Sequence, residues 1–391
     1  MKNFCLSSLS GLCLLGLLLS TGCKKEESPS NSTSTSQSSQ NQPIKIGAIV
    51  PLTGDAAGYG TSLKKGMDLA VEEINKHPDS AGKHLNIVFE DDRNLPQAGV
   101  SAFNKLVSVD NVPTVLGAMF SAVTLAIAPI AESQKVVLLS PTSSAIELTT
   151  AGDYIFRIYP SDSYDGQYLA TFANEKLHAK RVAVVTLQAA STTSISQLFK
   201  KLFTDSGGTV VLDETYQTGN TDFRAILTKI NEQKPDLVFL AGTLNETAGL
   251  LRQAKELGVK NTFLGISTLN DPKFLQLAGD AADGVLFSSP VFDPTSQAPE
   301  MTNFVSAYRV QYGQDPDILA GYGYDTVNIA ALAINQADKN GGVTPDNIKT
   351  ALYAIKNYPG VTGKMSFDKN GDVVKDLRIM TVSGGKFVSY Q

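Results

Sequence analysis

The chain has 391 residues, of which 42% are hydrophobic and 18% are charged, and its formal net charge is −5 at pH 7. This ordinary composition excludes wholesale disorder and a bundle of membrane helices. A slightly acidic chain also lacks the basic surface that nucleic acid requires, so we expect no nucleic-acid partner. At roughly 100–200 residues per domain, the length suggests two domains.

The first segment has the pattern of an export signal. Lys2 precedes an apolar run that is too short to span a bilayer and ends in Leu19-Ser20-Thr21-Gly22-Cys23. This ending resembles the bacterial lipobox, with a serine where leucine is usual. The resemblance implies a signal peptide over residues 1–22 and acylation of Cys23, which would anchor the protein to a lipid bilayer outside the cytoplasm. Simple secretion, with a cysteine beside the cleavage site, is the alternative.

The other two cysteines, Cys5 and Cys13, lie inside the predicted signal. The mature fold would therefore hold no thiol for a disulfide, a nucleophile or a metal. Residues 23–43 contain almost no apolar side chain and are predicted to remain a disordered tether.

From residue 44 onward, short apolar runs alternate with amphipathic ones. Consecutive apolar residues indicate strands that are buried on both faces, as in parallel sheets covered by helices. The stretch 62–75 is a predicted helix, because Leu63, Met67, Ala70 and Ile74 repeat at intervals of three and four. Strands are predicted over residues 44–52, 85–90, 114–119, 136–139, 182–187, 237–241 and 263–266. The alternation predicts a doubly wound α/β architecture.

The strand and helix units form two series, one up to about residue 160 and another over residues 164–290. A helical region over residues 301–337 should return to the first series, and residues 376–390 should form a hairpin. Two open sheets leave a cleft between them, and open α/β sheets bind ligands beyond the carboxyl ends of their strands. The default site is therefore that cleft.

Several stretches are similar to one known family. They are IKIGAIVPLTGDAAGYGTSLKKGMDLAVEEIN, VFEDD, GAMFSAVTLAIAPIAESQKVVLLSPTSSAIELT, and LLRQAKELG followed by LAGDAADG. These stretches resemble the periplasmic leucine/isoleucine/valine-binding proteins, in the same order and spacing, over almost the whole chain after Pro43. The resemblance implies a receptor without enzymatic activity or cofactor, which closes on a branched-chain-type amino acid or a similar small carboxylate or amide and delivers it to ABC permease subunits.

The resemblance also implies the fold and its division. It is the type I periplasmic binding protein fold, with two Rossmann-like lobes joined by a three-strand hinge. Lobe 1 would comprise residues 44–162 and 291–361, and lobe 2 would comprise residues 163–290 and 362–391. The chain would cross between the lobes near residues 161–163, 290–292 and 361–364.

In the first lobe, the family's carboxylate-binding groups fall on Ser121, Thr142 and Ser144, and an aromatic of its first loop falls on Tyr59. Ser121 follows an apolar strand and begins a predicted helix, where free amides attract an anion. Alternatively, Ser121 is only the N-cap of that helix, and Thr142 and Ser144 are turn hydroxyls.

The second lobe departs from the family. Ser267 stands where the family has the acid that pairs with the ligand's ammonium, and Ser191 and Thr243 stand where it has tyrosines. Enclosing an ammonium without a partner costs several kcal/mol. Either a neighbour such as Glu246 or Asp271 replaces the acid, or the ligand lacks an α-ammonium, and leucine then binds poorly. The family's small-loop disulfide is also missing, because Asn94 and Phe120 occupy its positions.

The other motifs give little evidence of a function. The glycine-rich loop 54–61 lacks the lysine of a phosphate-binding loop, and residues 368–372 lack the glutamate of a calcium loop. The three histidines, His77, His84 and His178, predict neither a triad nor a metal site. Two alternatives to a transport receptor are a ligand-sensing receptor component and a binder of a polar solute that is not an amino acid.

Overall fold

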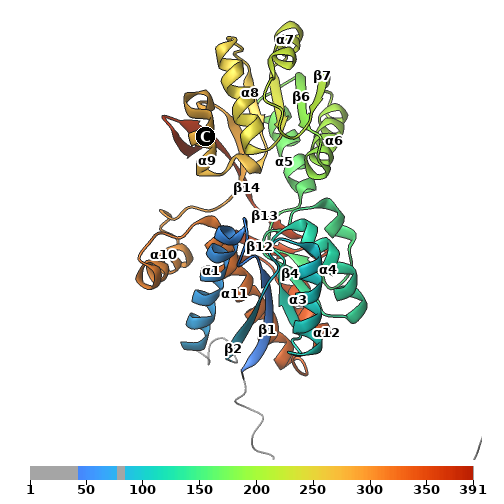
Figure 1. Ribbon diagram of the computed structural model, residues 1–391, viewed down its shortest axis with the longest axis vertical. Coiled ribbons are helices and arrows are strands. Elements are labelled where there is room, and N and C mark those ends of the chain that lie inside the picture. The colour runs from blue at the N-terminus through green and yellow to red at the C-terminus, as the bar shows by residue number, and fades with distance from the viewer. Residues whose placement is uncertain (1–42, 77–83, 391) are drawn as a thin grey trace, which may run out of the picture. The chain divides into compact units, whose positions relative to one another are not determined.

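The computed structural model describes residues 43–76 and 84–390 of the chain (Figure 1). The predicted signal peptide, Cys23 and all of the tether except its last residue lie outside the described residues. Within the part that is described, no helix is both long enough and apolar enough to cross a membrane.

The N-terminal half of the chain begins with a parallel sheet of five strands, in the order β2-β1-β3-β4-β5. Runs of consecutive Val, Ile and Leu are buried in its central strands, which confirms the predicted parallel arrangement. Its elements are β1 (Ile44–Val50), α1 (Ala57–Lys76), β2 (Leu85–Asp91), α3 (Pro96–Ser108), β3 (Thr114–Leu116), α4 (Ser121–Gln134), β4 (Val137–Ser140) and β5 (Ile155–Arg157).

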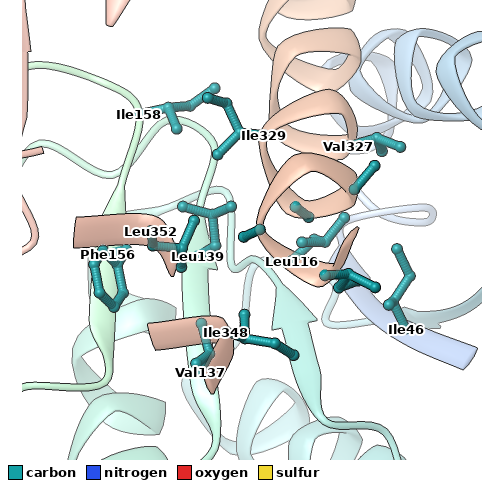
Figure 2. Close-up of a cluster of buried hydrophobic side chains, with 14 of the residues drawn as sticks. Ile46, Leu116, Val137, Leu139, Phe156, Ile158, Val327, Ile329, Ile348 and Leu352 are labelled. Atoms are coloured by element: carbon teal, nitrogen blue, oxygen red, sulfur yellow. The ribbon is translucent and has the colours of Figure 1, made fainter. Parts of the chain in front are cut away.

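Three later helices return to this part of the fold, as the sequence predicts for the region after residue 300; two of them pack in the core of the sheet and one packs against α1. They are α10 (Pro299–Tyr312), α11 (Ile318–Lys339) and α12 (Pro345–Ala354). Figure 2 shows Val327 and Ile329 of α11 in one buried cluster with Leu116 of β3 and Leu139 of β4. The first core is therefore built from both ends of the chain.

The second sheet has seven strands, in the order β15-β14-β10-β9-β8-β6-β7. Its last two strands form the predicted C-terminal hairpin, and β14 pairs antiparallel with β10. The elements are α5 (Asp162–Glu175), β6 (Arg181–Leu187), α6 (Ala190–Asp205), β7 (Thr209–Tyr216), α7 (Arg224–Gln233), β8 (Leu237–Ala241), α8 (Leu244–Glu256), β9 (Thr262–Gly265), α9 (Pro272–Ala278), β10 (Leu286–Pro290), β14 (Leu377–Ser383) and β15 (Lys386–Ser389).

A third, small sheet follows α12, in the region where the sequence predicted the third crossing between lobes. Strands β11 (Tyr358–Gly360), β12 (Gly363–Phe367) and β13 (Val373–Lys375) form a small antiparallel sheet. Met365, Phe367 and Val373 of this sheet are buried in the first core. Their alternation at every second residue is that of a strand with one buried face. The small sheet therefore packs with the first core, and β14 of the second sheet begins two residues after Lys375.

Candidate functional site

A cavity of about 670 Å³ is lined by residues that follow the carboxyl ends of strands from both sheets. Phe120 and Thr142 come after β3 and β4 of the first sheet, and Ser191, Thr243 and Ser267 come after β6, β8 and β9 of the second. This is where open parallel sheets present their loops and helix ends to a ligand. The volume lies in the range of pockets that enclose small molecules.

The cavity brings together six of the seven ligand residues that the resemblance implies. They come from loops spread over more than half of the chain, and no local pattern connects them. These residues are Tyr59, Thr142, Ser144, Ser191, Thr243 and Ser267.

Ser121 is the exception, because it does not line the cavity. Its Oγ accepts hydrogen bonds from the backbone amides of Ser144 and Ala145, each at 3.2 Å. Phe120 occupies the N-cap position of α4, and no side chain caps that helix. Ser121 is thus neither a direct lining group nor an N-cap. It holds the loop that carries Ser144.

Two threonine hydroxyls of the cavity already donate within the protein. Thr142 Oγ1 donates to the Met119 carbonyl at 2.7 Å, and Thr243 Oγ1 donates to Glu246. A hydroxyl that donates still has lone pairs that accept from a ligand N–H group. These two side chains are therefore positioned as acceptors.

The two acids that the sequence offered as replacements are both engaged. Glu246 does not line the cavity, and its Oε1 accepts from the Gly219 amide at 3.0 Å. Burial raises the pKa of Glu246, but hydrogen bonds from Thr243 and Gly219 outweigh that effect and lower it. Asp271 lines the cavity, yet it caps α9 by accepting from the Lys273 amide at 2.8 Å.

Sequence reasoning missed a third acid, Asp162, on the first turn of α5. Asp162 lines the cavity and is only 8% exposed. Burial raises its pKa to about 7, although a hydrogen bond with Ser144 opposes the shift. The signal in the sequence was a pair of acids, Asp162 and Asp165, one helical turn apart.

The remaining wall is mostly apolar. Met119 and Phe120 lie on the side of the first sheet, and Ile195, Leu244 and Ile266 on the side of the second. Such a wall suits an aliphatic group, and the hydroxyls beside it suit a polar one. Among residues 43–76 and 84–390, no group of three or more His, Cys, Asp or Glu side chains is arranged to hold a metal ion.

The sequence profile of the periplasmic binding protein family matches residues 43–386. The chain belongs to the periplasmic binding protein family. The leucine-, isoleucine-, valine-, threonine- and alanine-binding protein of Pseudomonas aeruginosa is 31% identical to this binding protein over 333 residues, which are 84% of this chain and 87% of that protein. The resemblance seen in the sequence is thereby confirmed.

Solved structures show the same two-lobed α/β fold. A branched-chain amino acid transporter substrate-binding protein from Streptococcus pneumoniae, in complex with isoleucine, is 33% identical with a TM-score of 0.73, over 88% of this chain and 98% of that one. A solute-binding protein of an ABC transporter from Rhodopseudomonas palustris, in complex with 3,4-dihydroxybenzoic acid, is 26% identical with a TM-score of 0.72, over 89% of this chain and 95% of that one. These structures confirm the predicted type I periplasmic binding protein fold for this chain.

Proposed function

We propose that this binding protein is the extracytoplasmic receptor of an ABC importer and that it captures a small amino acid of the branched-chain type without chemical change. The observation that carries the proposal is the cavity of about 670 Å³ at the strand ends of both sheets, with an apolar wall beside hydroxyls. The Pseudomonas aeruginosa relative and the isoleucine complex from Streptococcus pneumoniae support the same ligand class.

Each part of the cavity has a role in this proposal. The aliphatic side chain of the ligand would pack against Met119, Ile195 and Ile266, because burial of apolar surface is favourable. The ligand's carboxylate would bind near Ser144, whose loop Ser121 holds in place. Tyr59, at the edge, would cover the bound molecule. On the second side, Ser191, Thr243 and Ser267 would add contacts.

Closure of the two lobes would complete the site. The chain crosses between the two cores three times, and we place lobe 1 at residues 44–162 and 291–375 and lobe 2 at residues 163–290 and 376–391. A ligand that contacts both walls binds the closed form more tightly than the open form, and this difference in affinity shifts the equilibrium toward the closed form. The closed form is then what the permease subunits recognise.

We also propose that acylated Cys23 anchors the protein to a bilayer, with residues 23–43 as a tether. The basic start, the short apolar run and the Leu19-Ser20-Thr21-Gly22-Cys23 ending support this proposal. Mass spectrometry of the membrane fraction tests it. An N-terminal peptide beginning at an acylated Cys23 is expected, and an unmodified cysteine would contradict it.

A second ligand class has one specific observation in its favour. The Rhodopseudomonas palustris neighbour holds 3,4-dihydroxybenzoic acid in the same fold. A small aromatic acid would use the same carboxylate-binding hydroxyls, and Phe120 and Tyr59 offer aromatic surface.

A thermal-shift panel tests the proposal. The purified protein is heated with leucine, isoleucine, valine, their amides, 3,4-dihydroxybenzoate and simple polyols, and a bound ligand raises the melting temperature. We expect the amino acids to give the largest shifts. The Ser191→Trp variant should remove the shift, because the bulky ring fills the cavity.

The matched control is Ser101→Trp, since Ser101 is an exposed serine of α3 outside the cavity. It should keep the full shift. A shift with dihydroxybenzoate alone would favour the second ligand class. No shift with any compound, or a ligand altered after incubation, would contradict the receptor proposal.

A further inference from the structure

The start of α5 carries two acids that are nine-tenths buried. Asp162 is 8% exposed and Asp165 is 4% exposed, and they lie one helical turn apart. Each has one carboxylate oxygen without a hydrogen-bond partner among the described residues, Oδ2 of Asp162 and Oδ1 of Asp165. A buried polar atom without a partner is costly, so a pair of them calls for an explanation.

Neither acid is neutralised by a basic side chain within the described residues. The positive charge of Arg157 acts on Asp162, but the Arg157 guanidinium forms its bidentate salt bridge with Asp372. Asp165 accepts from the backbone amide of Ser267 at 3.3 Å. Two buried carboxylates near one cavity favour a cation as the missing partner.

One of the two acids lies beside Ser267, the residue that replaces the family's acid. Ser267 lines the cavity, and its amide binds Asp165, so α5 brings negative charge to the wall from which the resemblance expects an acid. Asp162 lines the same cavity beside Ser144. The serine at 267 leaves room for a carboxylate that approaches from a different element.

We propose that Asp162, with Asp165 behind it, pairs with the α-ammonium of the bound amino acid. This inference rests on the proposed function and narrows it, because it makes Asp162 the residue that selects amino acids over acids that lack the ammonium. The sequence-based hypothesis that leucine binds poorly assumed an ammonium without a partner, and Asp162 would supply that partner. Glu246 does not line the cavity, and Asp271, which caps α9, has no buried oxygen that lacks a partner among the described residues, whereas Asp162 has one.

The charges around Asp162 define a pH dependence. Burial raises the pKa of Asp162 to about 7. The negative charges of Asp165 and Glu147 add to this rise, and the Ser144 hydrogen bond and the positive charge of Arg157 oppose it. Only the ionised carboxylate pairs with an ammonium, so the ligand must displace a proton from part of the population. Affinity should therefore be about tenfold weaker at pH 6 than at pH 8. Binding at pH 7 should release a fraction of a proton, measured as heat that varies with the buffer.

The decisive experiment is calorimetric titration of the wild-type protein and the Asp162→Asn variant with isoleucine and with 3-methylpentanoate, the same acid without the ammonium. Asp162→Asn should weaken isoleucine binding by about 30-fold. It should leave 3-methylpentanoate binding unchanged or tighter, and it should abolish the pH dependence and the proton release.

The matched control is Asp205→Asn, which removes the charge of an exposed acid of α6 outside the cavity. It should change isoleucine affinity by less than about threefold. The melting temperature of Asp162→Asn without ligand should equal or exceed that of the wild type, because a buried charge without a basic partner is removed. A purely structural role for Asp162 would instead lower it.

The outcomes separate the two proposals. If the wild type binds isoleucine and Asp162→Asn binds it within threefold, the ammonium assignment is wrong and the proposed function stands. If the wild type binds 3-methylpentanoate at least as well as isoleucine, the assignment is also wrong. If the wild type binds none of leucine, isoleucine and valine, the amino-acid function fails together with the assignment.

Discussion

Arg157 donates from Nε to Asp372 Oδ1 across 2.6 Å and from Nη2 to Asp372 Oδ2 across 2.8 Å, with the arginine side chain 2% exposed. The same guanidinium donates from Nη1 to the Ala145 carbonyl at 2.6 Å. The pair therefore ties the cavity loop that ends at Ala145 to the turn between β12 and β13.

Removing the carboxylate of this pair should destabilise the fold. Asp372→Asn leaves a buried guanidinium with a neutral partner, and we expect the free energy of unfolding to fall by about 3 kcal/mol. Urea denaturation measures it. The control is Asp205→Asn in the exposed Lys201–Asp205 pair, which should cost less than about 1 kcal/mol. Equal losses of unfolding free energy in the two variants would contradict a stabilising role for the Arg157–Asp372 pair.

Lys375 lies at the last residue before the chain enters the second sheet. Its Nζ donates to Thr362 Oγ1 at 2.6 Å and to the Ile158 carbonyl at 3.3 Å, so it joins the turn between β11 and β12 to the segment that follows β5. Burial lowers the pKa of Lys375 to about 7, although Asp325 nearby opposes the shift.

This lowered pKa predicts how stability changes with pH. Between about pH 7 and pH 10 the unfolded chain binds a proton at Lys375 that the native protein does not, so the free energy of unfolding rises with pH, by roughly 1 kcal/mol per unit at most. Below about pH 7 both states are protonated, so the free energy of unfolding no longer changes with pH through Lys375 and the full cost of its buried charge remains. Lys375→Met should remove this rise, as measured by denaturation at several pH values. The same slope in wild type and variant would refute the prediction.

Helices α1 and α11 approach so closely that two glycines are required at their contact. A Cβ at Gly323 would lie 2.0 Å from the Leu63 carbonyl oxygen, and one at Gly66 would lie 1.9 Å from the Ala320 carbonyl oxygen. Because both obstacles are backbone atoms, no side chain can move away to relieve the clash.

Gly323→Ala should therefore lower the free energy of unfolding by about 3 kcal/mol. Thermal denaturation with a matched control checks this. Gly249 is a helical glycine of α8 whose added Cβ would meet only Phe223, at 3.6 Å. Gly249→Ala should be neutral or stabilising by up to about 1 kcal/mol. The packing argument fails if the two variants lose similar stability.

Tyr59 is 48% exposed at the edge of the cavity, and its ring meets that of Phe120 edge-on at 6.4 Å. Tyr59→Ala should weaken ligand binding about tenfold, because the ring that covers the bound molecule is lost. The melting temperature without ligand should hardly change, since exposed side chains contribute little to folding. Val310→Ala, at an 86% exposed position of α10, is the control and should affect neither quantity. Unchanged affinity in Tyr59→Ala would remove Tyr59 from the site.

The parts of the fold that the sequence predicted are those with a one-dimensional pattern. Strand β8 and the last five residues of β1 are buried on both faces, so those stretches contain only apolar residues and glycine. Strand β7 lies at the edge of its sheet and has only one fully buried residue, so its TVVLDETY sequence gave no long apolar run. The small sheet of β11 to β13 was missed for the same reason.

The site was predictable only where the resemblance supplied positions. It identified Ser144 and Ser267 as residues of one cavity, although they are 123 residues apart in sequence. It could not show that the Ser121 hydroxyl turns toward the Ser144 amide, because side-chain direction depends on tertiary packing. Asp162 was missed because nothing in its local sequence shows that its helix starts against the cavity.

Calorimetric titration of the purified protein with isoleucine tests the central claim most directly. We predict saturable binding of one ligand per chain, with a dissociation constant of about 1 μM or tighter, which corresponds to about 8 kcal/mol. The ligand recovered afterwards should be unchanged. Absence of saturable binding of isoleucine, leucine and valine up to about 1 mM would contradict it.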